Sequence, residues 1–317
     1  MSVIQRVLIT GGCGFIGANL VRFLRELAGW ELRVVDDLRS GLSSYADDSL
    51  ADFIIGDVGE RSVLEGALEG VDAVVHLAAQ TGVIPSVENP VRDFEGNALG
   101  TFRVLEACRR RGIDRFIFAS SGAALGEVER PLHEEVVPRP VSPYGAGKLT
   151  GEAYCQSYAS AYGMGTVALR FSNVYGPYST HKNNAIPNFI KALLSGEALE
   201  IFGDGSQSRD FIYVDDLCDA IFRALTSKEA RGEVFQLATG VETTVLELIA
   251  AVQTAVGGPK TEVHFGERRA GEVYKSRVDI SKVSTILGYE PQVSLDGGLG
   301  LTADWYRKNW LPQQPGA

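Results

Sequence analysis

The chain of 317 residues carries 40 acidic and 30 basic residues, which gives a net charge of −10 at pH 7. This charge disfavours binding to nucleic acid or to an anionic membrane, although a local group of arginines can still hold a small anionic ligand. The four cysteines (Cys13, Cys108, Cys155 and Cys218) have no metal-ligand or disulfide spacing, and no segment reads as a membrane span or signal peptide. We therefore expect a soluble cytoplasmic protein without a metal site.

The first half of the chain alternates short apolar runs with helical patterns. Strands are predicted at Arg6–Thr10, Glu31–Asp36, Phe53–Asp57, Ala73–Leu77, Arg115–Ser120 and Thr166–Arg170. Helices are predicted between them, notably at Phe15–Leu27, Asn97–Arg111 and Tyr144–Tyr162. Continuous apolar strands are typical of parallel strands that are buried on both faces. The repetition predicts right-handed βαβ units and an α/β fold with a doubly wound parallel sheet of the Rossmann type.

The second half is more mixed. The stretch Phe171–Asn184 has no clear period and is predicted to be a loop, and loops of this size are usually functional. Further elements are predicted at Ile186–Leu194, Leu199–Phe202, Asp210–Val214, Asp215–Leu225, Val234–Leu237, Val245–Val256 and Leu295–Lys308. We expect a dinucleotide-binding domain made of residues 1–172 and about 210–240. A smaller lobe, made of residues 173–209 and about 241–312, is expected to bind the substrate.

A glycine-rich turn follows the first predicted strand and opens the first predicted helix. Gly11, Gly14 and Gly17 allow a tight turn and let a pyrophosphate approach the free N–H groups of the helix N-terminus. We expect these glycines, together with Phe15 and Ile16, to contact a dinucleotide. The alternative is a plain strand-to-helix turn.

Acidic and small residues end the next strands. Asp36 stands where a carboxylate would bind a ribose 2′-hydroxyl and repel a 2′-phosphate, which predicts NAD rather than NADP, although the nearby Arg39 can weaken this preference. Asp57 and Val58 end the third predicted strand and are expected to hold the adenine, with a helix N-cap as the alternative role for Asp57. The fourth strand ends in small side chains that would face the cofactor: Leu77, Ala78 and Ala79.

Tyr144 and Lys148 stand four residues apart on a predicted helix, so that they share one face. An unperturbed tyrosine has a pKa of about 10, and a nearby ammonium together with an oxidised nicotinamide would lower it. Ser121 follows the fifth predicted strand, at the edge where doubly wound sheets place their chemistry. The spacing predicts a base that takes a proton from a secondary alcohol. The alternative, a solvated helix face, is disfavoured because all three residues occur together with the dinucleotide motif.

With these motifs in place, the chain resembles the extended short-chain dehydrogenases/reductases and, among them, the UDP-glucose 4-epimerases. The resemblance extends from Val7 to about Trp310. The matching stretches are Gly11–Gly17, His76–Ala79, Asn97–Thr101, Phe118–Ser121, Ser142–Gly145, Lys148, Leu169–Asn173, Gly203–Gly205, Arg209–Phe211 and Asp215–Asp216.

The resemblance implies several roles for residues of this chain. Ser121, Tyr144 and Lys148 would be catalytic, and the cofactor would be NAD, which Asn97 and Phe171 would also contact. The substrate would be a UDP-sugar, held by Ser121, Tyr144, Ala123, Asn173, Asn184, Ala185, Phe202, Arg209, Arg269 and Glu272. For Phe202, a place in the core is an equal alternative. The family also implies a homodimer through the helices Asn97–Arg111 and Tyr144–Tyr162.

Some positions depart from relatives that catalyse other reactions. Sugar dehydratases of this family place Asp-Glu after the catalytic hydroxyl residue, whereas this chain has Gly122 and Ala123. Glucuronate decarboxylases have Arg after the Gly-Pro of the substrate loop, whereas this chain has Tyr178, although His181 and Lys182 nearby are able to meet a sugar carboxylate.

We therefore expect NAD-dependent C4 epimerisation of a UDP-sugar of the glucose or galactose type, with N-acetylated and uronic forms left open. Ser276 stands where some epimerases have a bulky tyrosine, which favours acceptance of an N-acetyl group. The alternatives are a 4,6-dehydratase, a decarboxylase or a 4-ketoreductase on the same fold. A more remote alternative is a non-catalytic NAD-binding sensor.

Overall fold

The computed structural model describes residues 4–45, 51–128, 131–258, 261–267 and 277–314. Its centre is a sheet of seven parallel strands in the order β11-β6-β5-β4-β1-β2-β3. These strands are β1 (Arg6–Thr10), β2 (Glu31–Asp36), β3 (Asp52–Ile55), β4 (Ala73–His76), β5 (Arg115–Ser121), β6 (Gly165–Phe171) and β11 (Glu233–Leu237). This arrangement confirms the predicted α/β fold with a doubly wound parallel sheet.

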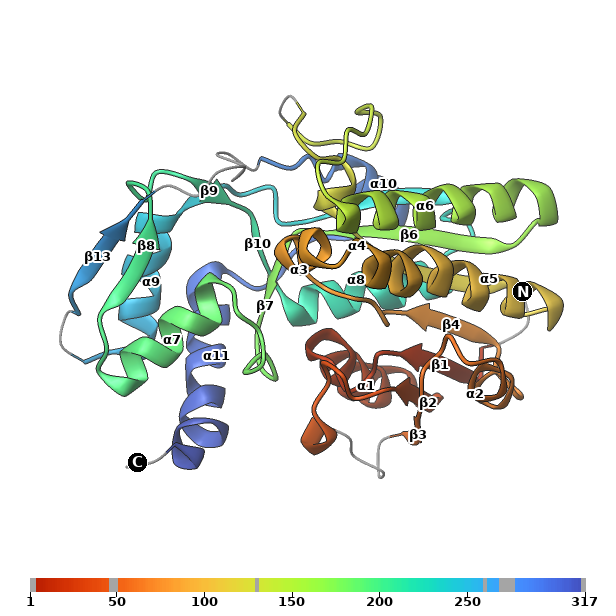
Figure 1. The fold of residues 1–317 in the computed structure, drawn as a ribbon, viewed down its shortest axis with the longest axis horizontal. Helices are drawn as coiled ribbons and strands as arrows, with labels where there is room; N and C mark the ends of the chain where they lie inside the picture. The colour runs from red at the N-terminus through yellow and green to blue at the C-terminus, as the bar shows by residue number, and fades with distance from the viewer. Residues whose placement is uncertain (1–3, 46–50, 129–130, 259–260, 268–276, 315–317) are drawn as a thin grey trace.

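Helices cover both faces of this sheet, because successive side chains of a strand point to opposite faces. On β1, Val7 and Ile9 join the buried cluster that contains residues of α1 (Phe15–Ala28) and α8 (Val214–Thr226). Leu8 between them joins the cluster that contains residues of the helices on the other face. Those helices are α2 (Arg61–Ala67), α5 (Gly100–Arg110) and α6 (Pro143–Tyr162). In Figure 1, α6 is drawn beside β6, and α5 lies between β6 and β4.

A smaller group of elements lies at one side of the sheet, to the left in Figure 1. It contains α7 (Ala185–Ser195), α9 (Val245–Val256), α11 (Leu295–Asn309) and the parallel pair β8 (Leu199–Phe202) and β13 (Val263–Gly266). Two more strand pairs are short: β7 (Asn173–Tyr175) with β10 (Phe211–Tyr213), and β9 (Ser208–Arg209) with β12 (Thr243–Thr244). One buried apolar cluster contains residues of both the sheet and this group, so that the core is continuous.

The structure corrects several predicted elements. The stretch 171–184 is not entirely a loop, because β7 lies within it and pairs with β10, a partner too distant in sequence for any local pattern to reveal. β3 ends before Asp57, whose carboxylate accepts a hydrogen bond from the Gly59 N–H at 2.7 Å and starts a turn. The predicted helix from Asn97 begins as a π-helical turn at Phe94–Leu99, which precedes α5.

Four helices were not predicted: α2, α3 (Val83–Glu88), α4 (Pro90–Asp93) and α10 (Ser281–Leu287). All four have at most seven residues, so their periodicity is too short to be recognised.

The described residues contain no helix with the length and apolarity needed to cross a membrane. Within the same residues there is no group of three or more histidine, cysteine or acidic side chains that is able to hold a metal ion. All four cysteines are buried and none forms a disulfide.

Candidate active site

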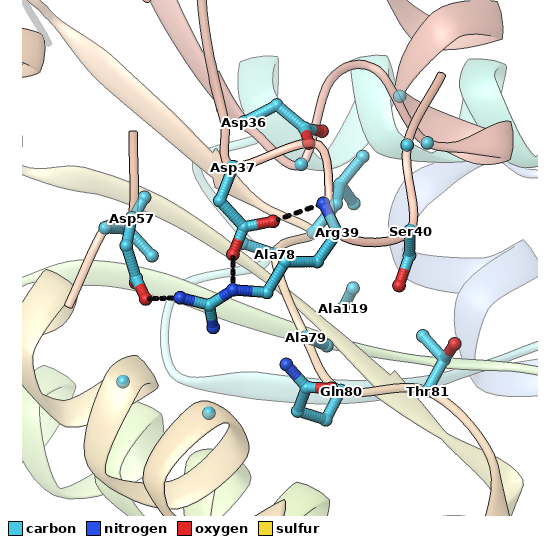
Figure 2. Close-up of a pocket in the computed structure, with 18 of the residues that line it drawn as sticks. Asp36, Asp37, Arg39, Ser40, Asp57, Ala78, Ala79, Gln80, Thr81 and Ala119 are labelled. Carbon is cyan, nitrogen blue, oxygen red and sulfur yellow. Dashed lines mark hydrogen bonds and ion pairs between the residues drawn. The ribbon is translucent and has the colours of Figure 1, made fainter. Parts of the chain in front are cut away.

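A cavity of about 550 Å³ lies at the carboxyl edge of the sheet, where the turns that follow β1, β2, β3 and β4 meet the end of β5. Figure 2 shows part of its wall. The strand order reverses between β1 and β4, and open α/β sheets bind their ligands at such a point. The cavity wall includes every predicted cofactor residue except Asn97: Gly11, Gly14, Phe15, Ile16, Gly17, Asp36, Asp57, Val58, Leu77, Ala78, Ala79, Tyr144, Lys148 and Phe171.

The glycine turn has the geometry that a dinucleotide needs. Gly11 has a φ of +73°, and a Cβ atom there would lie 2.8 Å from the backbone nitrogen of Ala78. A Cβ atom on Gly17 would overlap the Gly11 carbonyl oxygen. Gly14 is the N-cap of α1, and no side chain caps this helix end. The helix N-terminus is therefore open to the cavity, and these residues fit a pyrophosphate.

Asp36 ends β2 and faces the cavity, as Figure 2 shows. Its two carboxylate oxygens accept hydrogen bonds from the Cys13 N–H at 2.9 Å and the Leu38 N–H at 2.8 Å. Burial raises the pKa of Asp36, and these two hydrogen bonds oppose the change. Asp36 therefore holds the backbone of the glycine turn at Cys13, and it also lines the cavity wall.

Arg39 is held by two carboxylates. Its guanidinium donates to Asp57 at 2.7 Å and forms an ion pair with Asp37 at 3.2 Å, and Figure 2 shows both interactions. A 2′-phosphate would have to compete with these carboxylates for Arg39. The arrangement therefore agrees with the predicted preference for NAD over NADP.

Asn97 differs from its expected role because its side chain does not line the cavity. Its Oδ1 accepts from the Gln80 N–H at 3.0 Å, and its Nδ2 donates to the Gln80 carbonyl oxygen at 2.9 Å and to Asp93 at 2.8 Å. Asn97 therefore fixes the segment that follows β4. Gln80 and Thr81 on this segment do line the cavity, and sequence reasoning missed both. Both directly follow Leu77–Ala79, which were predicted to face the cofactor, and this position could have identified them.

Local sequence explains how α6 presents Tyr144 and Lys148. The Ser142 Oγ accepts from the Gly145 N–H at 3.1 Å as the N-cap, and Pro143 occupies the first turn. Lys148 Nζ donates to the Ala119 carbonyl oxygen at 2.8 Å and lies 5.7 Å from the centroid of the Tyr144 ring. The two side chains therefore reach the same cavity without a direct hydrogen bond between them.

The electrostatics of this pair differ from the sequence expectation. Burial raises the pKa of Tyr144, and its hydrogen bond with the Ser121 side chain offsets only part of the increase. Burial also lowers the pKa of Lys148 to about 8. The expected decrease in the pKa of Tyr144 is therefore not produced by the protein groups alone. The positive charge of a bound oxidised nicotinamide would still act to lower the pKa of Tyr144.

A buried ion pair supports α6, and sequence reasoning missed it. Glu152 stands one turn after Lys148, and both of its oxygens accept from Arg170 on β6, at 2.8 and 2.7 Å. Ser120 on β5 also donates to Glu152. The side chains of Glu152 and Arg170 are only 3% and 4% exposed. This network ties α6 to the two strands whose ends form the site.

Ser121 and Ala123 lie close together beside α6. Ser121 ends β5, and its Oγ accepts from the Ala123 N–H at 3.2 Å. Gly122 and Ala123 form a short 3-10 turn. Neither Ser121 nor Ala123 is part of the cavity wall described above.

The other predicted substrate residues lie away from that wall. The Asn173 backbone N–H and Nδ2 both donate to the Asp210 carbonyl oxygen, at 3.1 and 3.2 Å. Asn184 precedes α7 and is exposed, Phe202 is half-buried at the end of β8, and Arg209 lies on β9. Ala185 is the first residue of α7. Arg269, Glu272 and Ser276 lie outside the described residues, so the structure does not place them.

The chain is similar to known proteins over almost its whole length. The model of the NAD dependent epimerase/dehydratase family matches residues 7–238. The chain is 37% identical over 314 residues to UDP-glucose 4-epimerase of Mycolicibacterium smegmatis, covering 96% of this chain and 99% of that protein. It is 33% identical over 322 residues to dTDP-glucose 4,6-dehydratase of Streptomyces niveus, covering 97% and 95%.

The fold is similar to that of solved structures. The crystal structure of UDP-glucose 4-epimerase from Thermotoga maritima with UDP-glucose matches with a TM-score of 0.90 and 37% identity. The match covers 96% of this chain and 99% of that chain.

Proposed function

The chain belongs to the NAD dependent epimerase/dehydratase family, and we propose that it catalyses epimerisation at C4 of a UDP-sugar. The observation that carries the proposal is the arrangement of α6, which brings Tyr144 and Lys148 to the wall of a cavity that fits a dinucleotide. A non-catalytic NAD sensor has no need of these two residues beside Ser121.

Each catalytic side chain has a distinct task. Bound NAD supplies the acceptor and donor of the hydride at C4 of the sugar. Tyr144, as the phenolate, takes the proton of the 4-hydroxyl group and returns it after the 4-keto sugar has presented its other face. Ser121 donates a hydrogen bond to the reacting oxygen or to the phenolate. Lys148 holds a positive charge near the phenol, which favours the phenolate form.

The turn that follows Ser121 favours epimerisation over dehydration. Dehydration needs one group that takes the C5 proton and another that protonates the leaving C6 hydroxyl. Gly122 and Ala123 occupy the turn directly after β5, and neither has a side chain that transfers protons. With Tyr144 as the base and no acid on this turn, the chemistry stops at the exchange of hydride and proton at C4.

The nucleotide-sugar site is proposed on the smaller group of elements. Asn173, Ala185, Phe202 and Arg209 lie on strands or helices there, and Asn184 directly precedes α7. Arg209 would oppose the diphosphate in a protein that is acidic overall. Arg269 and Glu272 complete the proposed set. The division into residues 1–172 with about 210–240, and 173–209 with about 241–312, follows from the same proposal.

We further propose a cytoplasmic homodimer that pairs through α5 and α6. The sugar is proposed to be of the glucose or galactose type, and N-acetylated and uronic sugars are alternative substrates.

The test is incubation of the purified chain with UDP-galactose, with the product analysed by NMR and mass spectrometry. The proposal expects UDP-glucose of unchanged mass and a changed C4 proton coupling. A product lighter by one water would instead identify a 4,6-dehydratase. Loss of carbon dioxide from UDP-glucuronate would identify a decarboxylase, and the absence of turnover on a panel of UDP-sugars would favour the sensor.

A further inference from the structure

Residues 176–182 form a segment that crosses from the smaller group of elements to α1. The Pro177 carbonyl oxygen accepts from Asn19 Nδ2 on α1 at 3.0 Å, and the Thr180 hydroxyl bonds the Tyr45 hydroxyl at 2.8 Å. Asn19 Nδ2 also donates to the Phe15 carbonyl oxygen at 2.8 Å, which places this contact within one turn of the helix N-terminus. The segment is therefore fixed beside the glycine turn.

The backbone of this segment is strained at Tyr178, which has a φ of 62° without being glycine. Its ring lies between the Arg22 guanidinium, 4.2 Å from the ring centroid, and the Trp305 ring, 4.9 Å away. Packing of this kind is what keeps an unfavourable backbone conformation in place. The result is a defined turn at Tyr178. After Ser179 and Thr180, the chain reaches His181 and Lys182, which line the cavity wall.

His181 has buried ring nitrogens without partners at that wall, and the half-buried Lys182 lines the same wall. Both ring nitrogens of His181 are inaccessible to solvent and have no hydrogen-bond partner among the residues that the structure describes. Within the same set of residues, no carboxylate lies at ion-pair distance from Lys182, whose pKa is lowered by burial. Buried polar groups without partners are unfavourable, and an anion bound in the cavity would give the His181 ring a partner and Lys182 a counter-charge.

Arg39, Arg92, Arg103 and Lys148 also line this wall, and Arg103 donates to the Gly59 carbonyl oxygen at 3.3 Å. Arg39 is held by Asp37 and Asp57, and Lys148 donates to the Ala119 carbonyl oxygen. The glycine turn and the N-terminus of α1 supply only partial positive charge to a pyrophosphate that carries two negative charges. Lys182 would supply a full charge from the same cavity wall.

We propose that Lys182 and His181 bind the pyrophosphate of the dinucleotide, so that the loop 171–184 closes the cofactor site. The inference rests on the NAD cofactor of the proposed function, but not on the reaction at the sugar. The two side chains line the same cavity as Gly14 and Phe15, whereas the proposed substrate residues Asn173, Asn184 and Arg209 do not. This difference favours the phosphates of the cofactor over those of the nucleotide sugar.

The test compares three ligands by calorimetry on the full chain after removal of NAD. ADP-ribose contains the pyrophosphate, adenosine lacks it, and UDP reports the nucleotide-sugar site. Lys182→Gln should lower the affinity for ADP-ribose about 10- to 100-fold, because a hydrogen bond to a charged group is lost. The binding of adenosine and UDP should change less than twofold, and Lys182→Arg should keep most of the affinity for ADP-ribose.

Lys308→Gln, at an exposed position on α11, is the matched control and should leave all three affinities unchanged. His181→Phe should also lower the affinity for ADP-ribose alone, by a smaller factor than Lys182→Gln. Weaker UDP binding with unchanged ADP-ribose binding would overturn the inference and assign Lys182 to the substrate phosphates. Unchanged affinity for all three ligands would also overturn it. Because no sugar is converted in this experiment, its outcome is independent of the epimerase assay.

Discussion

Replacing Glu152 by glutamine tests whether the buried ion pair behind the active site holds the catalytic helix in place. Glutamine keeps the shape of the side chain but removes its charge. Arg170 then remains buried, with its guanidinium facing a neutral amide in place of two carboxylate oxygens. The hydrogen bond that Ser120 donates to Glu152 also becomes weaker, since its acceptor is no longer charged.

The expected decrease in the free energy of unfolding follows from the burial of the ion pair. Removing one partner of a buried ion pair costs about 3–5 kcal/mol, because the other charge is left uncompensated. A typical protein has a free energy of unfolding of about 5–15 kcal/mol, so this loss would be a large fraction of the total. Replacing both Glu152 and Arg170 by methionine should recover most of it, since the desolvation of both charges is then avoided.

The assay is unfolding in urea at a fixed NAD concentration, because bound ligand itself adds to the free energy of unfolding. Glu65→Gln is the control: Glu65 forms an exposed ion pair with Arg61 on α2, and its loss should leave the unfolding midpoint unchanged. If Glu152→Gln shifts the midpoint as little as the control does, the buried pair does not hold α6 and the reasoning is wrong.

Three further predictions concern the site directly. Tyr144→Phe keeps the ring but removes the proposed base, so kcat should fall about 10²- to 10⁴-fold while NAD stays bound; near-normal turnover in this variant would contradict the assignment. Asp36→Ala removes the carboxylate that faces the cofactor, so the ratio of the Kd values for NADP and NAD should move closer to one; tighter binding of NADP than NAD by the unchanged protein would refute the ribose assignment. Since burial lowers the pKa of Lys148 to about 8, its ammonium loses its proton as the pH rises through that value, and kcat/KM should decrease above it. Lys148→Arg, which stays charged, should remove this decrease, and a pH profile unchanged in that variant would assign the decrease to another group.

Patterns along the chain were sufficient to predict the family and the sheet. The glycine turn from Gly11 to Gly17 and the pair Tyr144 and Lys148 are local signals, because each depends on a few neighbouring residues and a helical or turn geometry. The family match over residues 7–238 confirms the resemblance drawn from them. The strands were found because residues buried on both faces leave continuous apolar runs.

The sequence could not predict the partners of polar groups, since these come from distant parts of the chain. Asn97 matches the family pattern, yet only the structure shows that its amide holds Gln80 and Asp93 and does not line the cavity. The pair of Glu152 with Arg170 is equally invisible to local periodicity. The pKa of Tyr144 depends on its burial, which no spacing reveals.

The sequence by itself determined which residue types are available for chemistry: a tyrosine and a lysine one turn apart, and Gly122 and Ala123 where an acid would be needed for dehydration. Tertiary structure decided which of them share a cavity. β7 pairs with β10, and the segment after it turns back at Tyr178 to place Lys182 beside the turn that begins at Gly11. The physical reason is range: backbone preference and hydrophobic period act over one or two turns, whereas contacts between distant segments are set by packing of the whole core.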